Sequence, residues 1–119
     1  MARVKPFICI RPNEGVAAQV AALPYDVYSR SEAKKAVEGK PLSFLNIDRP
    51  ETQYDESFDM YSAKAYETAR DMLKAEIKDG TFITDEERAY YVYELTMDGR
   101  RQTGIVACCA IDDYVNGVI

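Results

Sequence analysis

The sequence has no histidine, no tryptophan and only three cysteines among 119 residues. Without histidine, these residues provide no imidazole base, no Ser-His-Asp triad and no histidine-ligated metal. No apolar run approaches the ~18 residues that a membrane-spanning helix needs, and the first residues lack the apolar segment of a signal peptide. We therefore expect a cytoplasmic protein that neither enters nor crosses a membrane.

Basic residues are also in the minority, with 15 Lys and Arg against 20 Asp and Glu, for a net charge of -5. Because nucleic-acid affinity comes largely from Lys and Arg on phosphates, we expect no nucleic-acid partner. Apolar residues make up 47% and charged residues 29% of the chain, as in ordinary globular proteins. The length predicts a single domain over residues 1–119. Composition leaves the oligomeric state open.

The three cysteines are Cys9, Cys108 and Cys109. The adjacent pair would point to opposite faces of a strand and makes a poor disulfide, and the odd count fits a reducing compartment. The surrounding run, 104–111, is apolar on both faces and predicts a central buried strand. We expect Cys108 and Cys109 to be buried structural residues, because reactive thiols need an accessible, electropositive setting.

One helical pattern is clear. Apolar residues recur at spacings of three and four and predict one face of a long amphipathic helix: Phe58, Tyr61, Ala65, Ala69, Met72, Leu73 and Ile77. We expect this face to pack against a sheet through Ile105, Ala107 and Cys109, or through the residues that alternate with them. The predicted fold class is α+β, with a mixed or antiparallel sheet packed by this helix and by shorter helices.

Other elements follow from local signals. Ser29 and Glu32 have the spacing of a capping box and predict a helix that ends near Gly39. A further short helix is predicted over 14–22, a hairpin turn over 97–100, and strands over 4–10, 41–47 and 90–95. Asn116-Gly117 predicts a second hairpin, whose returning strand would have only two residues. We interpret the sequence as a fragment of a longer protein on this basis.

Three charged clusters are candidates for chemistry. Arg11 follows a predicted strand and can present a guanidinium to a phosphate, or it can simply end the strand at the surface. Asp26 follows Pro24 and Tyr25, where a rigid loop can hold a base or a metal ligand, although Asp also caps turns. Residues 48–51 place two carboxylates and Arg49 at a predicted strand end, or form a solvated turn. We expect Arg11, Asp26, Arg49 and Glu51 to meet in one polar cleft.

Nine tyrosines are present, three of them near one predicted strand: Tyr90, Tyr91 and Tyr93. Such residues can stack on a nucleotide base or form a partner surface. They also commonly pack half-buried with a solvated hydroxyl. We favour the packing role for these tyrosines.

The order of several motifs resembles a known family. These motifs are Lys5-Pro6-Phe7, Arg11-Pro12, Leu23-Pro24-Tyr25-Asp26-Val27, Ser43-Phe44-Leu45, Arg49-Pro50-Glu51 and Gln102-Thr103-Gly104-Ile105. Together they resemble the domain of unknown function 1015 family, bacterial and archaeal proteins of roughly four hundred residues. The resemblance covers nearly the whole chain. It implies that further chain follows Ile119 and acts with it as a partner.

The resemblance also implies a function. Such proteins are often encoded beside serine-biosynthesis enzymes, and the family is distantly similar to the ParB and sulfiredoxin-like fold, which includes kinases of free serine. It implies phosphoryl transfer to serine, with ATP or ADP and Mg²⁺ in the longer protein and no metal site in this chain. Asp26 or Glu51 would be catalytic, and Arg11, Tyr25 and Arg49 would bind phosphate or substrate. The alternative is a non-catalytic regulatory or interaction module of the same pathway.

Overall fold

The computed structural model describes residues 1–119, which divide into two compact units. Residues 11–83 form one unit, here called the helical unit. Residues 1–10 and 84–119 form the other, here called the strand unit. The chain is of mixed α+β type, with two-stranded sheets and one longer helix. The sequence predicted this fold class. None of its helices combines the length and apolar character needed to cross a membrane.

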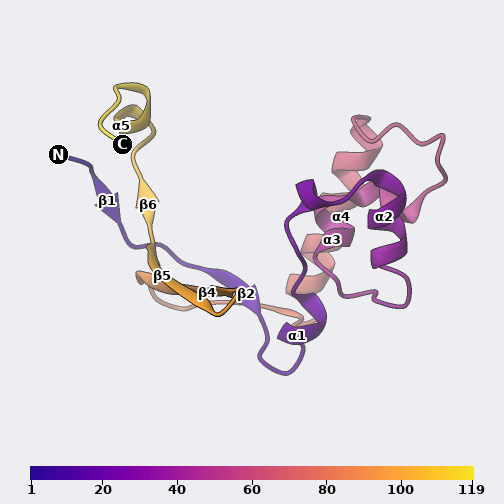
Figure 1. Cartoon of the computed structure of the whole chain (residues 1–119), viewed down its shortest axis with the longest axis horizontal. Coiled ribbons are helices and arrows are strands. Elements are labelled where there is room, and N and C mark those ends of the chain that lie inside the picture. Colours follow the sequence, from indigo (N-terminus) through magenta and orange to yellow (C-terminus); the bar gives the residue numbers. More distant parts are fainter. The chain divides into compact units, whose positions relative to one another are not determined.

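The helical unit is built from short helices around one longer helix (Figure 1). Its elements are α1 (Ala17–Val20), η1 (Tyr25–Val27), α2 (Arg30–Ala36), α3 (Leu45–Asp48), η2 (Pro50–Gln53) and α4 (Ala63–Lys78). The boundary between the two units falls within β2 (Ile10–Pro12) and β3 (Phe82–Thr84), which pair with each other.

The apolar face of α4 packs against a buried cluster formed by Val20, Ile47 and Phe82. The residues of α4 that contact this cluster are Ala69, Met72, Leu73 and Ile77, as the helical spacing predicted. Two parts of that prediction are wrong: Phe58 and Tyr61 precede the helix, with Tyr61 75% exposed, and Ile105 in the supposed partner sheet is 78% exposed. Periodicity identifies the face of a helix that is buried, but it does not identify what covers that face.

The predicted capping box at the start of α2 is confirmed. The Ser29 hydroxyl accepts a hydrogen bond from the Glu32 amide, and the Glu32 carboxylate accepts one from the Ser29 amide at 2.8 Å. Gly39 follows the helix with a φ of 68°. This motif was predictable because all of its partners lie within four residues.

The strand predicted over 41–47 is wrong, because this segment forms a turn and then α3. The Asn46 side-chain amide donates to the carbonyls of Lys40 and Pro41 at 3.1 and 3.3 Å, which stabilises the turn. The Phe44 amide donates to the Val20 carbonyl at 2.9 Å and joins the segment to α1. A short apolar run fits a buried helical turn as well as a strand, so its pattern could not decide between them.

The strand unit contains two antiparallel pairs. β1 (Val4–Lys5) pairs with β6 (Cys108–Cys109), and β4 (Tyr91–Met97) pairs with β5 (Arg100–Val106). The predicted turn between β4 and β5 is confirmed, with positive φ at Asp98 (51°) and Gly99 (74°). The buried strand predicted over 104–111 is wrong: β5 ends at Val106, and both β5 and β6 are exposed. Cys108 and Cys109 are therefore exposed free thiols, contrary to the prediction.

The predicted hairpin at Asn116-Gly117 is also wrong, because α5 (Ile111–Val115) ends there and Gly117 has a φ of 69°. A positive φ serves the end of a helix as well as a hairpin turn. Arg3 joins this helix to the start of the chain: its backbone amide and its Nη2 donate to the Asp113 carboxylate at 2.6 and 2.8 Å. These hydrogen bonds lower the pKa of Asp113.

Tyr91 is the one strand tyrosine with a clear packing role. It is half-buried, with its ring 5.0 Å from that of Phe7, and its hydroxyl donates to the Asp85 carboxylate at 2.8 Å. Burial and the Asp85 contact raise the pKa of Tyr91. Tyr90 and Tyr93 are instead 54% and 57% exposed. The packing role predicted for all three is therefore confirmed for Tyr91 alone.

Candidate functional site

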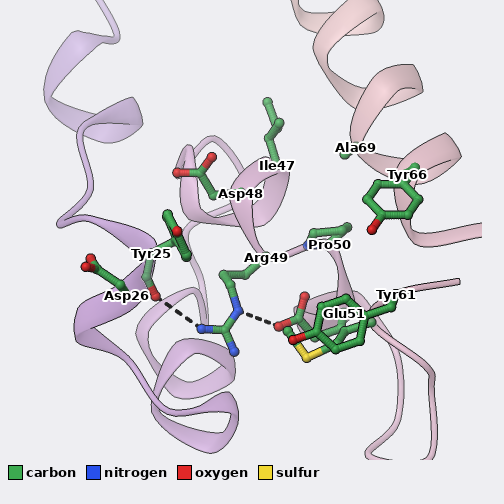
Figure 2. A pocket seen from close by; sticks show the side chains of 11 residues that line it. Tyr25, Asp26, Ile47, Asp48, Arg49, Pro50, Glu51, Tyr61, Tyr66 and Ala69 are labelled. Carbon is green, nitrogen blue, oxygen red and sulfur yellow. Dashed lines mark hydrogen bonds and ion pairs between the residues drawn. The ribbon is translucent and has the colours of Figure 1, made fainter. Parts of the chain in front are cut away.

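The helical unit contains a pocket of about 470 Å³ between η1, the α3–η2 corner and the start of α4 (Figure 2). This volume lies in the range of small-molecule sites. Residues of two predicted clusters line it: Tyr25 and Asp26 from η1, and all four residues of 48–51 from the corner, among them Arg49 and Glu51. The pocket therefore brings together two sequence motifs that are more than twenty positions apart.

The first side of the pocket is the single turn η1. Pro24 precedes it with a φ of -53°, and the Val27 amide donates to the Pro24 carbonyl at 3.2 Å. Proline restricts the backbone at this entry point, so the turn presents neighbouring side chains from a defined position. Tyr25 is 58% exposed and Asp26 is also exposed. Both are accessible to a ligand in the pocket.

The second side is the corner between α3 and η2. Arg49 leaves the helix with φ -127° and ψ 67°, and Pro50 begins η2. The cause is local, because a residue before proline disfavours the helical conformation, whereas proline itself suits the first position of a new turn. The Arg49-Pro50 sequence therefore directs the Arg49 side chain away from the path of α3.

Arg49 connects the two sides of the pocket. Its Nη1 donates to the carbonyls of Tyr25 and Tyr28 at 3.1 and 3.0 Å, and its Nε donates to Glu51 Oε1 at 2.5 Å. Figure 2 shows this guanidinium between η1 and Glu51. Arg49 and Glu51 are 8% and 2% exposed. The pair thus holds η1 against the corner, and Glu51 is a buried counter-ion rather than an open carboxylate.

Asn46 stabilises the same corner, and the sequence analysis did not single it out. Its Oδ1 accepts from the Thr52 hydroxyl at 3.3 Å, and its backbone carbonyl accepts from the side-chain amide of Gln53 at 3.3 Å. Asn46 and Thr52 are both buried. An Asn at this position carries no local signature, because its partners are set by the fold of the corner.

The charge of the pocket is negative. Three carboxylates, those of Asp26, Asp48 and Glu51, line it against the single guanidinium of Arg49. Since Arg49 and Glu51 neutralise each other, the uncompensated charges are those of Asp26 and Asp48. Partial burial raises the pKa of Asp48. Such a pocket favours a ligand that carries a positive group.

The remaining side of the pocket is aromatic and comes from the start of α4 and the segment before it. Tyr61 and Tyr66 line this side and are 75% and 64% exposed (Figure 2). Together with Tyr25 they give the pocket three aromatic rings in addition to its carboxylates. Aromatic faces and carboxylates are the groups that recognise ammonium ions. The sequence analysis assigned Tyr61 to the core, because its spacing matched the helical face.

Arg11 is not among the residues that line the pocket. It lies on β2 and is exposed. The expected meeting of four charged residues is therefore found for Asp26, Arg49 and Glu51 but not for Arg11. The position of Arg11 near a predicted strand end could not show whether its side chain would reach the pocket. The chain also has no group of three or more Asp, Glu, Cys or His side chains close enough to hold a metal ion.

The fold and the pocket define a mixed α+β protein with a small, carboxylate-rich site. The chain belongs to a family described as protein of unknown function (DUF1015), whose model matches residues 4–119. The match confirms the resemblance drawn from the sequence motifs and includes every residue of the pocket. No curated protein and no solved structure matches the chain.

Proposed function

We propose that the pocket of the helical unit binds a small hydroxylated amino acid, free serine being the expected one, in a cytoplasmic phosphotransferase. The observation that carries the proposal is the charge of the pocket: Asp26 and Asp48 are uncompensated, and three tyrosines line the same pocket. A carboxylate forms a strong, charge-assisted hydrogen bond with an ammonium group. Aromatic faces add cation–π attraction. An amino acid supplies that ammonium group.

Within this proposal, the carboxylates have different roles. Asp48 pairs with the ammonium group of the amino acid. Asp26, exposed on a proline-anchored turn, accepts the hydroxyl proton when the hydroxyl oxygen attacks phosphorus. Glu51 takes no proton in this scheme, because it is buried against Arg49. Its role is to position Arg49, which in turn holds η1.

The residues of this pocket do not fit the triphosphate and Mg²⁺ of a nucleotide. The only cation that lines the pocket, Arg49, is neutralised by Glu51 and hydrogen-bonded to two carbonyls. Two further carboxylates would repel phosphate. A nucleotide donor with Mg²⁺ stays a prediction for the longer protein, bound by residues outside this pocket. The relation to the ParB and sulfiredoxin-like fold likewise stays a prediction.

Calorimetric titration of the chain with serine tests the binding step. Serine should bind saturably, and hydroxypropionate, which lacks the ammonium group, should bind at least about tenfold more weakly because a charge-assisted hydrogen bond is lost. Asp48→Asn should weaken serine binding by a similar factor. Glu14→Gln is the matched control, since Glu14 is an exposed carboxylate that does not line the pocket. Absence of saturable serine binding, or equal binding of hydroxypropionate, would contradict the proposal.

A turnover assay on the longer protein tests the catalytic step. Serine-dependent nucleotide consumption should fall by about a hundredfold or more in Asp26→Asn, since general-base catalysis contributes ~10²–10⁴-fold. Serine binding by this variant should persist. Full activity of Asp26→Asn would remove Asp26 from the mechanism.

A second candidate function is supported by the β4–β5 hairpin. Tyr93, Leu95 and Met97 alternate along β4 and therefore share one face, and they are 57%, 53% and 76% exposed. Such a face suits contact with another protein and favours a regulatory or interaction module of the serine pathway. Serine binding without any turnover in the longer protein would favour this function over the phosphotransferase.

A further inference from the structure

A second pocket lies in the strand unit, apart from the residues of the proposed function. It has a volume of about 230 Å³ and is lined by Arg3, Lys5, Cys108, Cys109 and Ala110. It therefore combines two basic side chains with two exposed thiols. An exposed, electropositive environment is what makes a cysteine reactive.

The strand register identifies which thiol shares a face with the basic residues. Lys5 lies opposite Cys108 in the β1–β6 pair, so their side chains are on the same face. The Ala110 amide donates to the Arg3 carbonyl at 3.2 Å, and both residues line the pocket with Lys5. Cys109 lies opposite Val4 on the other face. Both thiols line the pocket, and Cys108 is the one that shares a strand face with Lys5.

The two cations of this pocket differ in availability. Arg3 is bound to the Asp113 carboxylate through Nε and Nη2 at 3.1 and 2.8 Å, and Asp112 lies 3.7 Å from the same guanidinium. Lys5 forms no such ion pair. The Lys5 ammonium is therefore the charge that can attract an anion to Cys108.

We propose that Cys108 is a modification site for small disulfides that carry carboxylates, the chemical class of oxidised glutathione. Cys108 loses its proton to solvent, and the thiolate attacks one sulfur of the disulfide. A new sulfur–sulfur bond forms at Cys108 while the old one breaks, and the other half of the reagent leaves as a thiolate. Lys5 binds a carboxylate of the reagent and raises its local concentration at the thiol.

Single-thiol variants of the chain test this assignment. Cys9→Ser/Cys109→Ser leaves Cys108 alone, and Cys9→Ser/Cys108→Ser leaves Cys109 alone as the matched control. Each variant reacts separately with dithiobis(nitrobenzoate), a dianionic disulfide, and with dipyridyl disulfide, which is uncharged. For each variant, the ratio of the two rate constants measures the preference for charge.

Cys108 should show an anionic-to-neutral rate ratio about fivefold higher than that of Cys109, the effect of one nearby unit charge in water. Lys5→Gln should remove this advantage, and added salt should reduce it. Equal ratios for the two thiols, or no effect of Lys5→Gln, would overturn the proposal. If a double variant fails to fold, labelling of the unmutated chain and of Lys5→Gln, with each cysteine quantified by mass spectrometry, gives the same comparison.

Discussion

The two units of this protein are stabilised by different interactions. All six buried apolar residues lie in the helical unit: Val20, Ala33, Leu45, Ile47, Ala65 and Phe82. The strand unit has no buried apolar residue, and its buried residue is the charged Asp113. Packing therefore stabilises the first unit, whereas strand pairing, hydrogen bonds and the Arg3–Asp113 contact stabilise the second.

The exposed hairpin illustrates the difference. Val92, Met97 and Ile105 are 75%, 76% and 78% exposed although all three are apolar. A two-stranded hairpin is only marginally stable by itself in water. A binding site that needs rigid elements is therefore expected in the helical unit, and the pocket of Asp26 and Arg49 lies there. The strand unit offers accessible surfaces and thiols.

The largest expected effect is loss of the buried ion pair of the helical unit. Arg49→Ala should destabilise this unit by about 3–5 kcal/mol, because Glu51 is then buried without a partner. Arg49→Ala/Glu51→Ala should recover part of the loss. Hydrogen exchange of α3 and α4 amides measures both.

The matched substitution in the strand unit is Arg3→Ala, which should lower the stability of its unit less than Arg49→Ala lowers that of the helical unit. Arg3 is largely exposed, with 60% of its side chain accessible, and the buried Asp113 carboxylate keeps its hydrogen bond from the backbone amide of residue 3 after the substitution. An equal or larger loss of stability for Arg3→Ala would contradict the expected difference between the Arg49–Glu51 and Arg3–Asp113 ion pairs.

Replacement of one leucine by alanine in each unit should also distinguish the two units, with a somewhat smaller effect on stability. Leu45→Ala should cost about 2–5 kcal/mol, because Leu45 is 1% exposed and its loss leaves a cavity. Leu95→Ala, at a residue that is 53% exposed, should change stability by no more than about 0.5 kcal/mol. Denaturant titration followed by exchange at each unit checks both values. Similar losses at the two positions would contradict the described difference in packing.

Protonation of two carboxylates, Glu76 in the helical unit and Asp113 in the strand unit, should affect stability with opposite signs, and this is the smallest expected effect. Burial, followed by repulsion from Asp79, raises the pKa of Glu76, whose Oε2 has no hydrogen-bond partner. Its protonation thus favours the folded helical unit: this stability is complete below the ordinary pKa of Glu and is lost as the pH rises through the raised value. Hydrogen bonds from Arg3 lower the pKa of Asp113, so its stability is present above the ordinary pKa of Asp and is lost as the pH falls through the lowered value.

Amide hydrogen exchange, measured across this acidic pH range and corrected for intrinsic exchange rates, tests the signs of the two stability contributions. Relative to the unmutated chain, Glu76→Gln should remove a stabilising contribution of acid to the helical unit, and Asp113→Asn should remove a destabilising contribution of acid to the strand unit. No change in the acid response of the helical unit in Glu76→Gln, or of the strand unit in Asp113→Asn, would contradict the assignment.

Local signals in the sequence predicted local structure well. The Ser29 capping box and the turn at Asp98 and Gly99 form as expected, since every partner is a near neighbour in the chain. Ambiguous local signals failed. The apolar run 41–47 became a turn and α3, and Asn116-Gly117 ended a helix, because in each case two structures share one pattern.

The site was predicted in part for the same reason. Pro24 and Pro50 marked the two rigid segments that carry Asp26 and Arg49, and both segments line one pocket. The burial of Glu51, the support from Asn46 and the exposure of Tyr61 were not predictable. Each depends on residues brought together from separate turns.

The sequence by itself determined the family, the mixed α+β class, the buried face of α4 from Ala65 onward and the proline-anchored turns. These follow from composition, period and neighbouring residues. Tertiary structure alone decided that α4 packs in a helical unit, that Arg49 is bound by Glu51 and the η1 carbonyls, and that Lys5 lies beside Cys108. Pairings between distant residues depend on how whole elements exclude water and satisfy their hydrogen bonds together, and no local pattern encodes them.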